Sequence, residues 1–261
     1  MLLIDAGNTR LKWAVLSEAR LGAQQAEAYA EWGVEQFRQR VLIPAGGIDR
    51  LLVGNVGGRR IASLIADAIA VVPEITAEFV EATRSGGGIQ NGYSDPSQLG
   101  VDRWAAMIGA RAHGAGPVCV VSVGTAMTID GVDASGLHLG GLIVPGPDLM
   151  VSSLMHNTSD IASRSQDGTL GKGLFADNTL GGVHQGTLHA LACLIQQAMN
   201  FMTTHCGQRP ALLITGGAAH RLEPFMTGPL QVLPDLVLKG LAVLAQASPQ
   251  QAPSGSSASK Q

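Results

Sequence analysis

The chain has 261 residues, enough for one large domain or two smaller ones with a sizeable core. Apolar residues make up 46% and charged residues 14%, against an average of about 25% charged, which excludes an intrinsically disordered chain. The formal net charge of −3 lacks the basic excess of nucleic-acid-binding proteins, so we expect no nucleic-acid partner. Glycine supplies 34 residues, nearly twice the ordinary share, without the three-residue period of collagen.

The first half of the chain predicts strands that alternate with helices. Apolar residues 2–4 and alternating residues 10–16 flank a turn that contains Gly7, which is the pattern of a β-hairpin. Asp95-Pro96 marks the start of a helix that we expect to run to His113. The other expected elements are a strand at 28–31, a helix at 34–42, a strand at 51–54, a helix at 59–71, a strand at 75–80 and a glycine-rich loop at 85–93.

Residues 114–117 form a boundary, and the pattern after it repeats the opening one. Apolar strands at 118–123 and 127–132 flank a short turn, Gly124-Thr125-Ala126, and a third strand is expected at 137–144. The remaining expected elements are helices at 147–156, 180–205 and 236–247 and a strand at 211–215. The pattern predicts an α/β protein with two related lobes, residues 1–115 and 116–247, and a disordered tail at 248–261.

The stretch from Asp5 to Lys12 is the most informative for chemistry. Exposed amides of the Gly7 turn, with the side chains of Asn8 and Thr9, can cradle phosphate oxygens. Asp5 could hold Mg²⁺ through water, and Lys12 could reach back to a phosphate. An ordinary hairpin turn is the alternative interpretation. The second Gly-Thr turn favours the phosphate site, because two facing turns would grip both ends of a polyphosphate.

A third glycine motif follows the buried strand expected at 211–215. The backbone of Gly216-Gly217 could lie against an adenine or a ribose, although simple packing of a helix start is an alternative. The chain has no Walker A motif, no G-x-G-x-x-G after a strand, no H-E-x-x-H and no G-x-S-x-G. Well-known phosphate, dinucleotide, zinc and serine-hydrolase motifs are therefore absent from the sequence.

Together these motifs resemble those of a known superfamily. Residues 5–12, 124–126 and 216–218 look like the phosphate-1, phosphate-2 and adenosine motifs of the acetate and sugar kinase/Hsp70/actin superfamily. Gly-Val-Asp-Arg at 100–103 resembles the Gly-x-Asp-Arg motif of type III pantothenate kinases, as do Asn91-Gly92-Tyr93, residues 139–146 and Asn178-Thr179. The resemblance extends from residue 2 to about residue 245. That family also includes proteins similar to the Bvg accessory factor.

The resemblance implies two actin-like (ribonuclease H-like) lobes with a nucleotide cleft between them. It also implies ATP-dependent phosphorylation of pantothenate to 4′-phosphopantothenate, the first step of coenzyme A biosynthesis, with Mg²⁺ and with Asp102 as the base. The implied ATP and phosphate residues are Asp5, Ala6, Gly7, Asn8, Thr9, Arg10, Leu11, Lys12, Gly124, Thr125, Gly216 and Gly217. The implied acceptor residues are Tyr93, Gly100, Val101, Asp102, Arg103 and Thr179, and a second subunit of a homodimer would complete that pocket.

One position departs from the family pattern. Many members carry Asp two residues before the second Gly-Thr turn, where it helps to hold K⁺ or NH₄⁺, and this chain has Ser122 there. A neutral hydroxyl is a poorer cation ligand than a carboxylate. We therefore expect the monovalent cation site to be weakened or rebuilt.

Two other functions remain open on the sequence. The same fold could phosphorylate another small hydroxylated metabolite, or it could serve as a nucleotide-binding regulator or transcription accessory protein. The presence of Asp5, Lys12 and Asp102 argues against an inactive enzyme. Three widely spaced cysteines, no signal-peptide pattern and no apolar run of about 18 residues predict a cytoplasmic protein without membrane contact.

Overall fold

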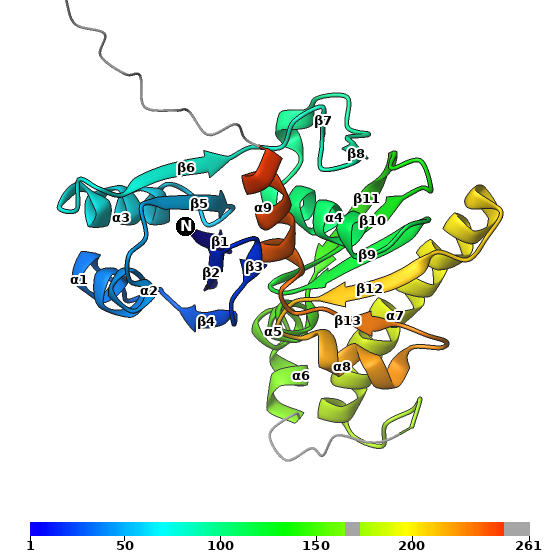
Figure 1. The fold of residues 1–261 in the computed structure, drawn as a ribbon. Helices are drawn as coiled ribbons and strands as arrows, with labels where there is room; N and C mark the ends of the chain where they lie inside the picture. Colours follow the sequence, from blue (N-terminus) through cyan, green and yellow to red (C-terminus); the bar gives the residue numbers. More distant parts are fainter. Residues whose placement is uncertain (165–172, 248–261) are drawn as a thin grey trace, which may run out of the picture.

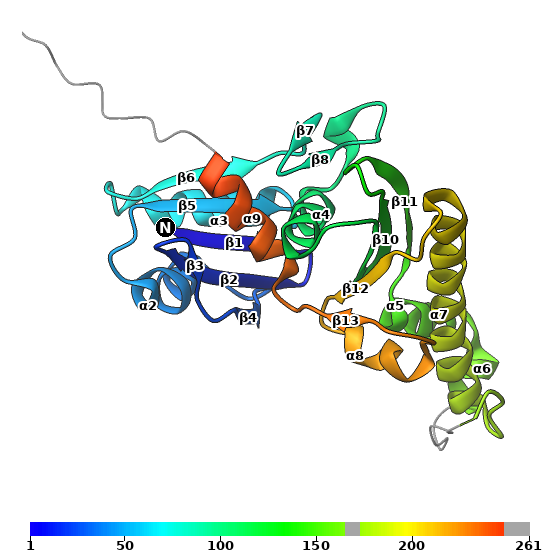
Figure 2. The same ribbon diagram turned by 45° about the vertical axis from the view of Figure 1, so that its right-hand side comes forward.

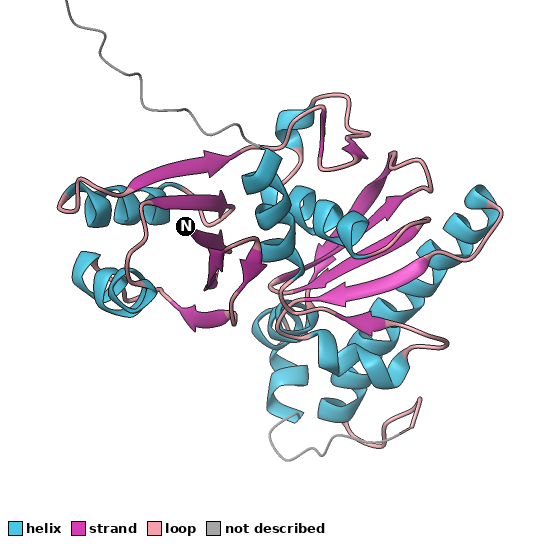
Figure 3. Cartoon of the chain, viewed as in Figure 1, coloured by secondary structure: helices cyan, strands magenta, loops and turns pink. Residues whose placement is uncertain are grey.

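The computed structural model describes residues 1–164 and 173–247, which form two α/β lobes, each built around one β-sheet (Figure 1). Two groups of strands are separated by helices (Figure 3). Helices α4 (Val101–His113) and α9 (Leu236–Ala247) pack against each other between the sheets (Figure 2). The expected fold class is confirmed. Among the described residues, no helix is both long and apolar enough to cross a membrane.

The first sheet has the strand order β3-β2-β1-β5-β6, with β4 also paired to β2. β1 runs antiparallel to β2 and parallel to β5, and β5 runs parallel to β6. The strands are β1 (Leu2–Ala6), β2 (Arg10–Ser17), β3 (Arg20–Leu21), β4 (Gln25–Ala28), β5 (Arg50–Asn55) and β6 (Thr76–Val80). The helices of this half are α1 (Val34–Phe37), α2 (Ile43–Ala45) and α3 (Arg59–Ala70).

The second sheet repeats this topology with the order β11-β10-β9-β12-β13. β9, β10 and β11 are antiparallel neighbours, and β9, β12 and β13 are parallel neighbours. The strands are β9 (Val118–Val123), β10 (Ala126–Val132), β11 (His138–Pro145), β12 (Ala211–Thr215) and β13 (Gln231–Val232). The helices are α5 (Pro147–Asn157), α6 (Ser159–Arg164), α7 (Thr179–Cys206) and α8 (Ala219–Leu222). The repeated strand order supports the relation between the lobes that their opening sequences predict.

Three clusters of buried side chains hold these layers together. One cluster lies between the lobes, where Trp104 of α4 and Leu241 of α9 join Leu3 of the first sheet and Val120 of the second. A second cluster fills the outer side of the first sheet, and a third fills the outer side of the second sheet beneath α7. Because side chains alternate across a strand, residues two positions from Leu3 and Val120 also face the inner layer. Asp5 and Ser122 occupy those positions.

The helix expected from Asp95 to His113 is wrong at its start. Asp95 does cap a helix, with its Oδ1 accepting a hydrogen bond from Ser97 N at 3.0 Å, but that element is a single 3₁₀ turn, Pro96–Gln98. Leu99 then adopts extended dihedral angles, Gly100 is also non-helical with a ψ of 133°, and α4 starts anew at Val101. Leu99 is buried in the layer between the lobes, which accounts for the break. The consequence is that Asp102 lies in the first turn of a helix.

The strand expected at 28–31 is also misplaced, because β4 covers Gln25–Ala28. Its register with β2 pairs Arg10 with Ala28. Tyr29 then leaves the sheet, and its hydroxyl donates a hydrogen bond to the carbonyl of Gly7 at 2.6 Å. The sheet pairing therefore frees Tyr29 to brace the first turn.

Other differences are smaller. The helix expected at 34–42 contains a π-helical turn at Arg38–Leu42 and continues through Pro44, which has no N–H to donate. The glycine-rich loop holds a two-stranded hairpin of β7 (Ser85–Gly86) and β8 (Ile89–Gln90). Gly87 and Gly88 form its turn with positive φ, and a Cβ on Gly87 would clash with Ile108 of α4. The tail predicted at 248–261 lies outside the described residues.

Candidate active site

The first Gly-containing turn joins β1 to β2 at the inner layer. Gly7 N donates a hydrogen bond to Arg10 O at 3.1 Å, and Asn8 and Thr9 between them are exposed. The side chains of Ala6 and Leu11 are buried, so only their backbones are available to a ligand. The Arg10 side chain donates to Ala26 O at 3.0 Å and is directed toward β4. The turn amides and the exposed hydroxyl of Thr9 are therefore the groups that can face a phosphate.

Asp5 and Lys12 form an ion pair beside this turn. They are direct partners in the β1–β2 register, and Lys12 Nζ lies 3.4 Å from Asp5 Oδ2. Burial raises the pKa of the Asp5 carboxyl, the Lys12 charge lowers it, and the nearby Asp102 charge raises it again. The influence of Asp102 on Asp5 places both carboxyl groups in one electrostatic environment, although they are far apart in sequence.

The second turn meets the first one across the two lobes. Gly124 N donates to Ala126 O at 3.0 Å, and Thr125 Oγ1 lies 2.9 Å from Thr9 Oγ1. Gly146, at the start of α5, donates its N–H to Thr125 O at 2.8 Å, and a Cβ there would collide with Gly124 O. The two turns therefore face each other across the lobes, which is the arrangement expected if both bind one polyphosphate.

Gly216 and Gly217 follow β12, as the sequence predicts. Gly216 has a φ of +99°, and a Cβ on it would collide with the backbone of Val123. Ala218 N donates to Val123 O at 3.1 Å. Close packing against β9 therefore accounts for Gly216. Gly217 is exposed, with nothing within 4 Å of the place where a Cβ would stand, so its backbone is open to a ligand.

Asp102 is the second residue of α4, and Gly100 is the N-cap residue of that helix. Burial raises the pKa of Asp102, while the backbone N–H and the charge of Arg103 lower it and the charge of Asp130 raises it. Asp102 Oδ1 accepts a hydrogen bond from Arg103 N at 2.8 Å. Val101 is buried. A carboxylate with a raised pKa at the start of a helix is well suited to accept a proton near neutral pH.

Arg103 is 5% exposed and sits in a network that sequence reasoning only partly anticipates. Its Nε donates to Asp130 Oδ2 at 2.9 Å, its Nη2 to Asp130 Oδ1 at 2.5 Å and its Nη1 to Tyr93 Oη at 2.9 Å. Burial alone would lower the pKa of Arg103, but the hydrogen bonds and charge of Asp130 raise it. His138 Nε2 lies 3.1 Å from Asp130 Oδ1, and the His138 ring stacks on Tyr93.

Sequence reasoning missed Asp130 and His138. The available signal was a carboxylate in the middle of an apolar strand at 127–132, since a buried charge usually has a partner.

Thr179, by contrast, is separate from this network. It is the first residue of α7, whose buried side chains pack on the outer face of the second sheet, whereas α4 packs on the inner face. The α7 side chains in that outer cluster begin at Leu188, well after Thr179 in the helix.

Both direct sheet partners of Ser122 are hydroxyl residues. The strand registers pair it with Thr128 of β10 and Thr215 of β12, which puts three hydroxyl side chains in a row. Among residues 1–164 and 173–247, no three His, Cys, Asp or Glu residues gather in a way that could hold a metal ion. Asp5 is therefore a candidate Mg²⁺ ligand only together with phosphate oxygens and water, which is the usual way Mg²⁺ binds in kinases.

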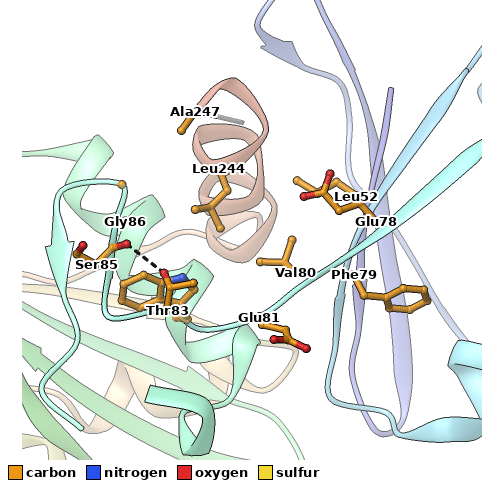
Figure 4. Close-up of a pocket in the computed structure, with 12 residues that line it drawn as sticks. Leu52, Glu78, Phe79, Val80, Glu81, Thr83, Ser85, Gly86, Leu244 and Ala247 are labelled. Atoms are coloured by element: carbon orange, nitrogen blue, oxygen red, sulfur yellow. Dashed lines mark hydrogen bonds between the residues drawn. The ribbon is translucent and has the colours of Figure 1, made fainter. Parts of the chain in front are cut away.

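A cavity of about 390 Å³ lies apart from these residues (Figure 4). It lies between β6, α9 and the β7–β8 hairpin, with Leu52, Val80 and Leu244 among its apolar walls and Glu78 and Glu81 among its polar ones. None of the predicted ATP or acceptor residues lines it.

Two lobes with one strand order, whose hairpin turns meet in the layer between them, are the arrangement of an actin-like fold. The comparisons with known proteins agree. The model of the family described as type III pantothenate kinase matches residues 1–200. The chain is 33% identical over 251 residues to the type III pantothenate kinase of Nitrosococcus oceani, with 94% of each chain covered. It is 38% identical over 248 residues to that of Azoarcus sp. strain BH72, with 95% of this chain and 91% of the relative covered.

Among solved structures, the chain is similar to a protein from Campylobacter jejuni described as a conserved Baf-family transcriptional activator. The TM-score is 0.57 at 20% identity, with 95% of this chain and 98% of the other covered, which supports the fold alone. The chain belongs to the type III pantothenate kinase family, and it is a phosphotransferase.

Proposed function

We propose that this chain transfers the γ-phosphoryl group of ATP to the primary hydroxyl of pantothenate, which forms 4′-phosphopantothenate, the first intermediate of coenzyme A biosynthesis. The observation that carries the proposal is the position of Asp102. Its carboxyl group lies in the first turn of α4, and that turn packs beside Asp5: a Cβ on Gly54, the register partner of Asp5, would lie 3.8 Å from Val101 Cγ1. Asp5 forms an ion pair with Lys12 beside the Gly7 turn, which is the turn expected to bind phosphate. A proton acceptor and a phosphate-binding group thus belong to one site.

In this mechanism the acceptor hydroxyl oxygen attacks the γ-phosphorus in line, the bond to the ADP oxygen breaks, and Asp102 takes the hydroxyl proton. Phosphoryl transfer asks the protein mainly for positioning and charge stabilisation. The amides of the two turns and the Lys12 ammonium supply these on the phosphate side. We assign Arg103 and Tyr93, which hydrogen-bond to each other, to bind the acceptor.

Mg²⁺ fits the donor set that this chain offers. Mg²⁺ takes one or two protein carboxylates and completes its coordination with phosphates and water. Asp5 is the carboxylate nearest the phosphate-type turn, and it would hold the ion directly or through water. The bound ion would neutralise phosphate charge.

A strict requirement for K⁺ or NH₄⁺ is not part of the proposal. The row of Ser122, Thr128 and Thr215 offers hydroxyl oxygens without a negative charge. Such a row would bind a monovalent cation weakly, so we expect activity to depend little on which monovalent cation is present.

The proposal includes a homodimer. Leu142 and Ile143 on the edge strand β11 are 45% and 62% exposed, and Leu149 and Leu154 on α5 are also exposed. Exposed large apolar side chains on an edge strand and a neighbouring helix are candidates for an interaction surface. A dimer through this surface would let Thr179 of the second chain complete the acceptor pocket. Light scattering should give a dimer for the native chain and a monomer for Ile143→Asp.

The test is a coupled assay with ATP, Mg²⁺ and pantothenate. We expect turnover by the native chain and a kcat about 10³-fold lower for Asp102→Asn, within the usual contribution of a general base. Asp67→Asn, at an exposed position of α3, is the matched control and should leave kcat unchanged.

Three outcomes would overturn parts of the proposal. Unchanged kcat in Asp102→Asn would remove its catalytic role. Faster turnover of another alcohol would change the acceptor. ATP binding without transfer to any alcohol would favour a regulatory protein of the same fold.

A further inference from the structure

The hydrogen bonds of Arg103 to Asp130 and Tyr93 leave some of its N–H groups free to donate to a ligand. A guanidinium has five N–H groups, and three of those on Arg103 donate to Asp130 and Tyr93. One N–H on each terminal nitrogen is left over. These two N–H groups, one on each terminal nitrogen, are available to a carboxylate. Tyr93 Oη accepts from Arg103, so its own proton can be donated elsewhere.

Asp130 decides where this guanidinium lies. Both of its oxygens accept from Arg103, and Oδ1 also faces His138 Nε2. Asp130 is 1% exposed and His138 is 1% exposed, so neither contacts bulk water. In the tautomer with the proton on Nε2, His138 donates to Asp130, and its Nδ1, which has no hydrogen-bond partner, carries no proton.

The surrounding backbone is shaped to admit this pair. A Cβ on Gly141 of β11 would collide with Arg103 Nη2 and with Asp130 Oδ1. A Cβ on Gly92, beside Tyr93, would collide with His138 O. Gly141 therefore leaves room for the Arg103–Asp130 ion pair. Gly92 allows the loop that carries Tyr93 to pack against β11.

We propose that Asp130 is a positioning residue for the acceptor: with His138 behind it, Asp130 holds Arg103 and Tyr93 so that they bind the acceptor's carboxylate. This inference rests on the proposed function, because it takes pantothenate, which carries a carboxylate, as the acceptor. Asp130 touches no substrate itself. Its effect should therefore be on acceptor binding and leave ATP binding unaffected.

The experiment compares Asp130→Asn with two variants of His138. Asp130→Asn should raise KM for pantothenate about 10- to 100-fold, the range expected when a charged hydrogen bond is weakened, and change KM for ATP less than about twofold. His138→Phe keeps a ring against Tyr93 and removes the donor to Asp130, whereas His138→Gln keeps a donor and removes the ring. We expect a clearly higher KM for pantothenate in His138→Phe than in His138→Gln.

A purely structural role would lower the folded fraction, so kcat would fall while both KM values stayed as in the native chain. That result, or an equal rise in both KM values, would overturn the inference. If Asp130→Asn does not fold, the His138 pair decides, and equal KM values for pantothenate in the two variants would overturn the inference.

Failure of the proposed function would be recognised separately, as absence of pantothenate binding and turnover in the native chain. The crystal structure of Asp130→Asn, or of His138→Phe if Asp130→Asn does not fold, then tests the positioning. Separation of Arg103 Nη1 from Tyr93 Oη beyond hydrogen-bond distance supports it, and an unmoved Arg103 overturns it.

Discussion

The two lobes present the same hairpin to the layer between them, with different side chains on it. Asp5 stands two residues before the turn glycine in the first lobe, and Ser122 stands two residues before the turn glycine in the second. The cross-strand partner of Asp5 is Lys12, and that of Ser122 is Thr128. One lobe thus carries an ion pair where the other carries two hydroxyls.

The two turns share a location in the fold, but they differ in the charge of their side chains. The shared strand order and the contact of Thr9 with Thr125 at 2.9 Å bring both turns to one place. Charge that can act on a phosphate comes from Lys12 in the first lobe. The second lobe offers amides and hydroxyls at the equivalent point, so we expect it to orient phosphate oxygens with little effect on their charge.

Among changes that test this comparison of the two turns, the largest effect should come from removing the charge of Lys12. Lys12→Met removes the ammonium beside the first turn, and we expect kcat/KM for ATP to fall about 10²-fold, as when a preorganised electrostatic group is lost. The equivalent Thr128→Val in the second lobe should cost less than about fivefold. Steady-state kinetics with varied ATP measures both. Similar losses in the two variants would contradict the division of roles.

A second effect concerns the helix that enters between the lobes. Gly100 has an ordinary negative φ, and a Cβ on it would lie 2.7 Å from Asp102 Oδ1. Gly100→Ala should therefore displace the Asp102 carboxylate without straining the backbone. We expect kcat about 10-fold lower, because small misplacements of reacting groups are costly, and a Tm within about 2 °C of the native value. A large fall in Tm would attribute the loss to folding.

The third prediction concerns a substitution that gives the second lobe the aspartate of the first. Ser122→Asp places a carboxylate where the first lobe has Asp5, beside the hydroxyls of Thr128 and Thr215. We expect this variant to gain a several-fold activation by K⁺ over Na⁺, since carboxylates are stronger ligands for hard cations than hydroxyls. The native chain should show less than about twofold. Strong K⁺ activation of the native chain, lost in Ser122→Ala, would contradict the weakened cation site.

The smallest effect at neutral pH comes from the raised pKa of Asp102. Burial is the main cause of the raised pKa, and the charge of Asp130 adds to it. A base works only when ionised, so kcat/KM should fall as the pH drops through the raised pKa of Asp102. The acid limb should lie above the value of about 3.9 of an ordinary aspartate. A limb at the ordinary value would contradict the buried position of Asp102. The measurement is kcat/KM for pantothenate against pH.

Much of this architecture could be predicted from local pattern. The hairpins that begin each half, α5 and α7 are found within a residue or two of the expected places. Their periodicity and turn residues are local signals. The phosphate-type turn could be singled out because it gathers Asp, Gly, Asn, Thr and Lys in eight residues.

The break before α4 could not be predicted in this way. Asp95-Pro96 is a valid helix start, and the chain does turn there for three residues. The helix stops because Leu99 packs into the layer between the lobes, which is a contact with residues far away in sequence. Helix start signals describe the first turn only, and the tertiary contacts decide how far it continues.

The sequence alone determined the two-lobed α/β class and the residues of the two turns, because these depend on periodicity and on short segments of chain. Only the tertiary structure decided that Asp102 starts a helix near Asp5, and that Arg103 lies between Tyr93, Asp130 and His138. Each of those relations joins side chains from different elements, and the partner of a buried charge is known only when the elements pack. The abundant glycines belong partly to this second class, since Gly92, Gly141 and Gly146 leave room for contacts that no local pattern predicts.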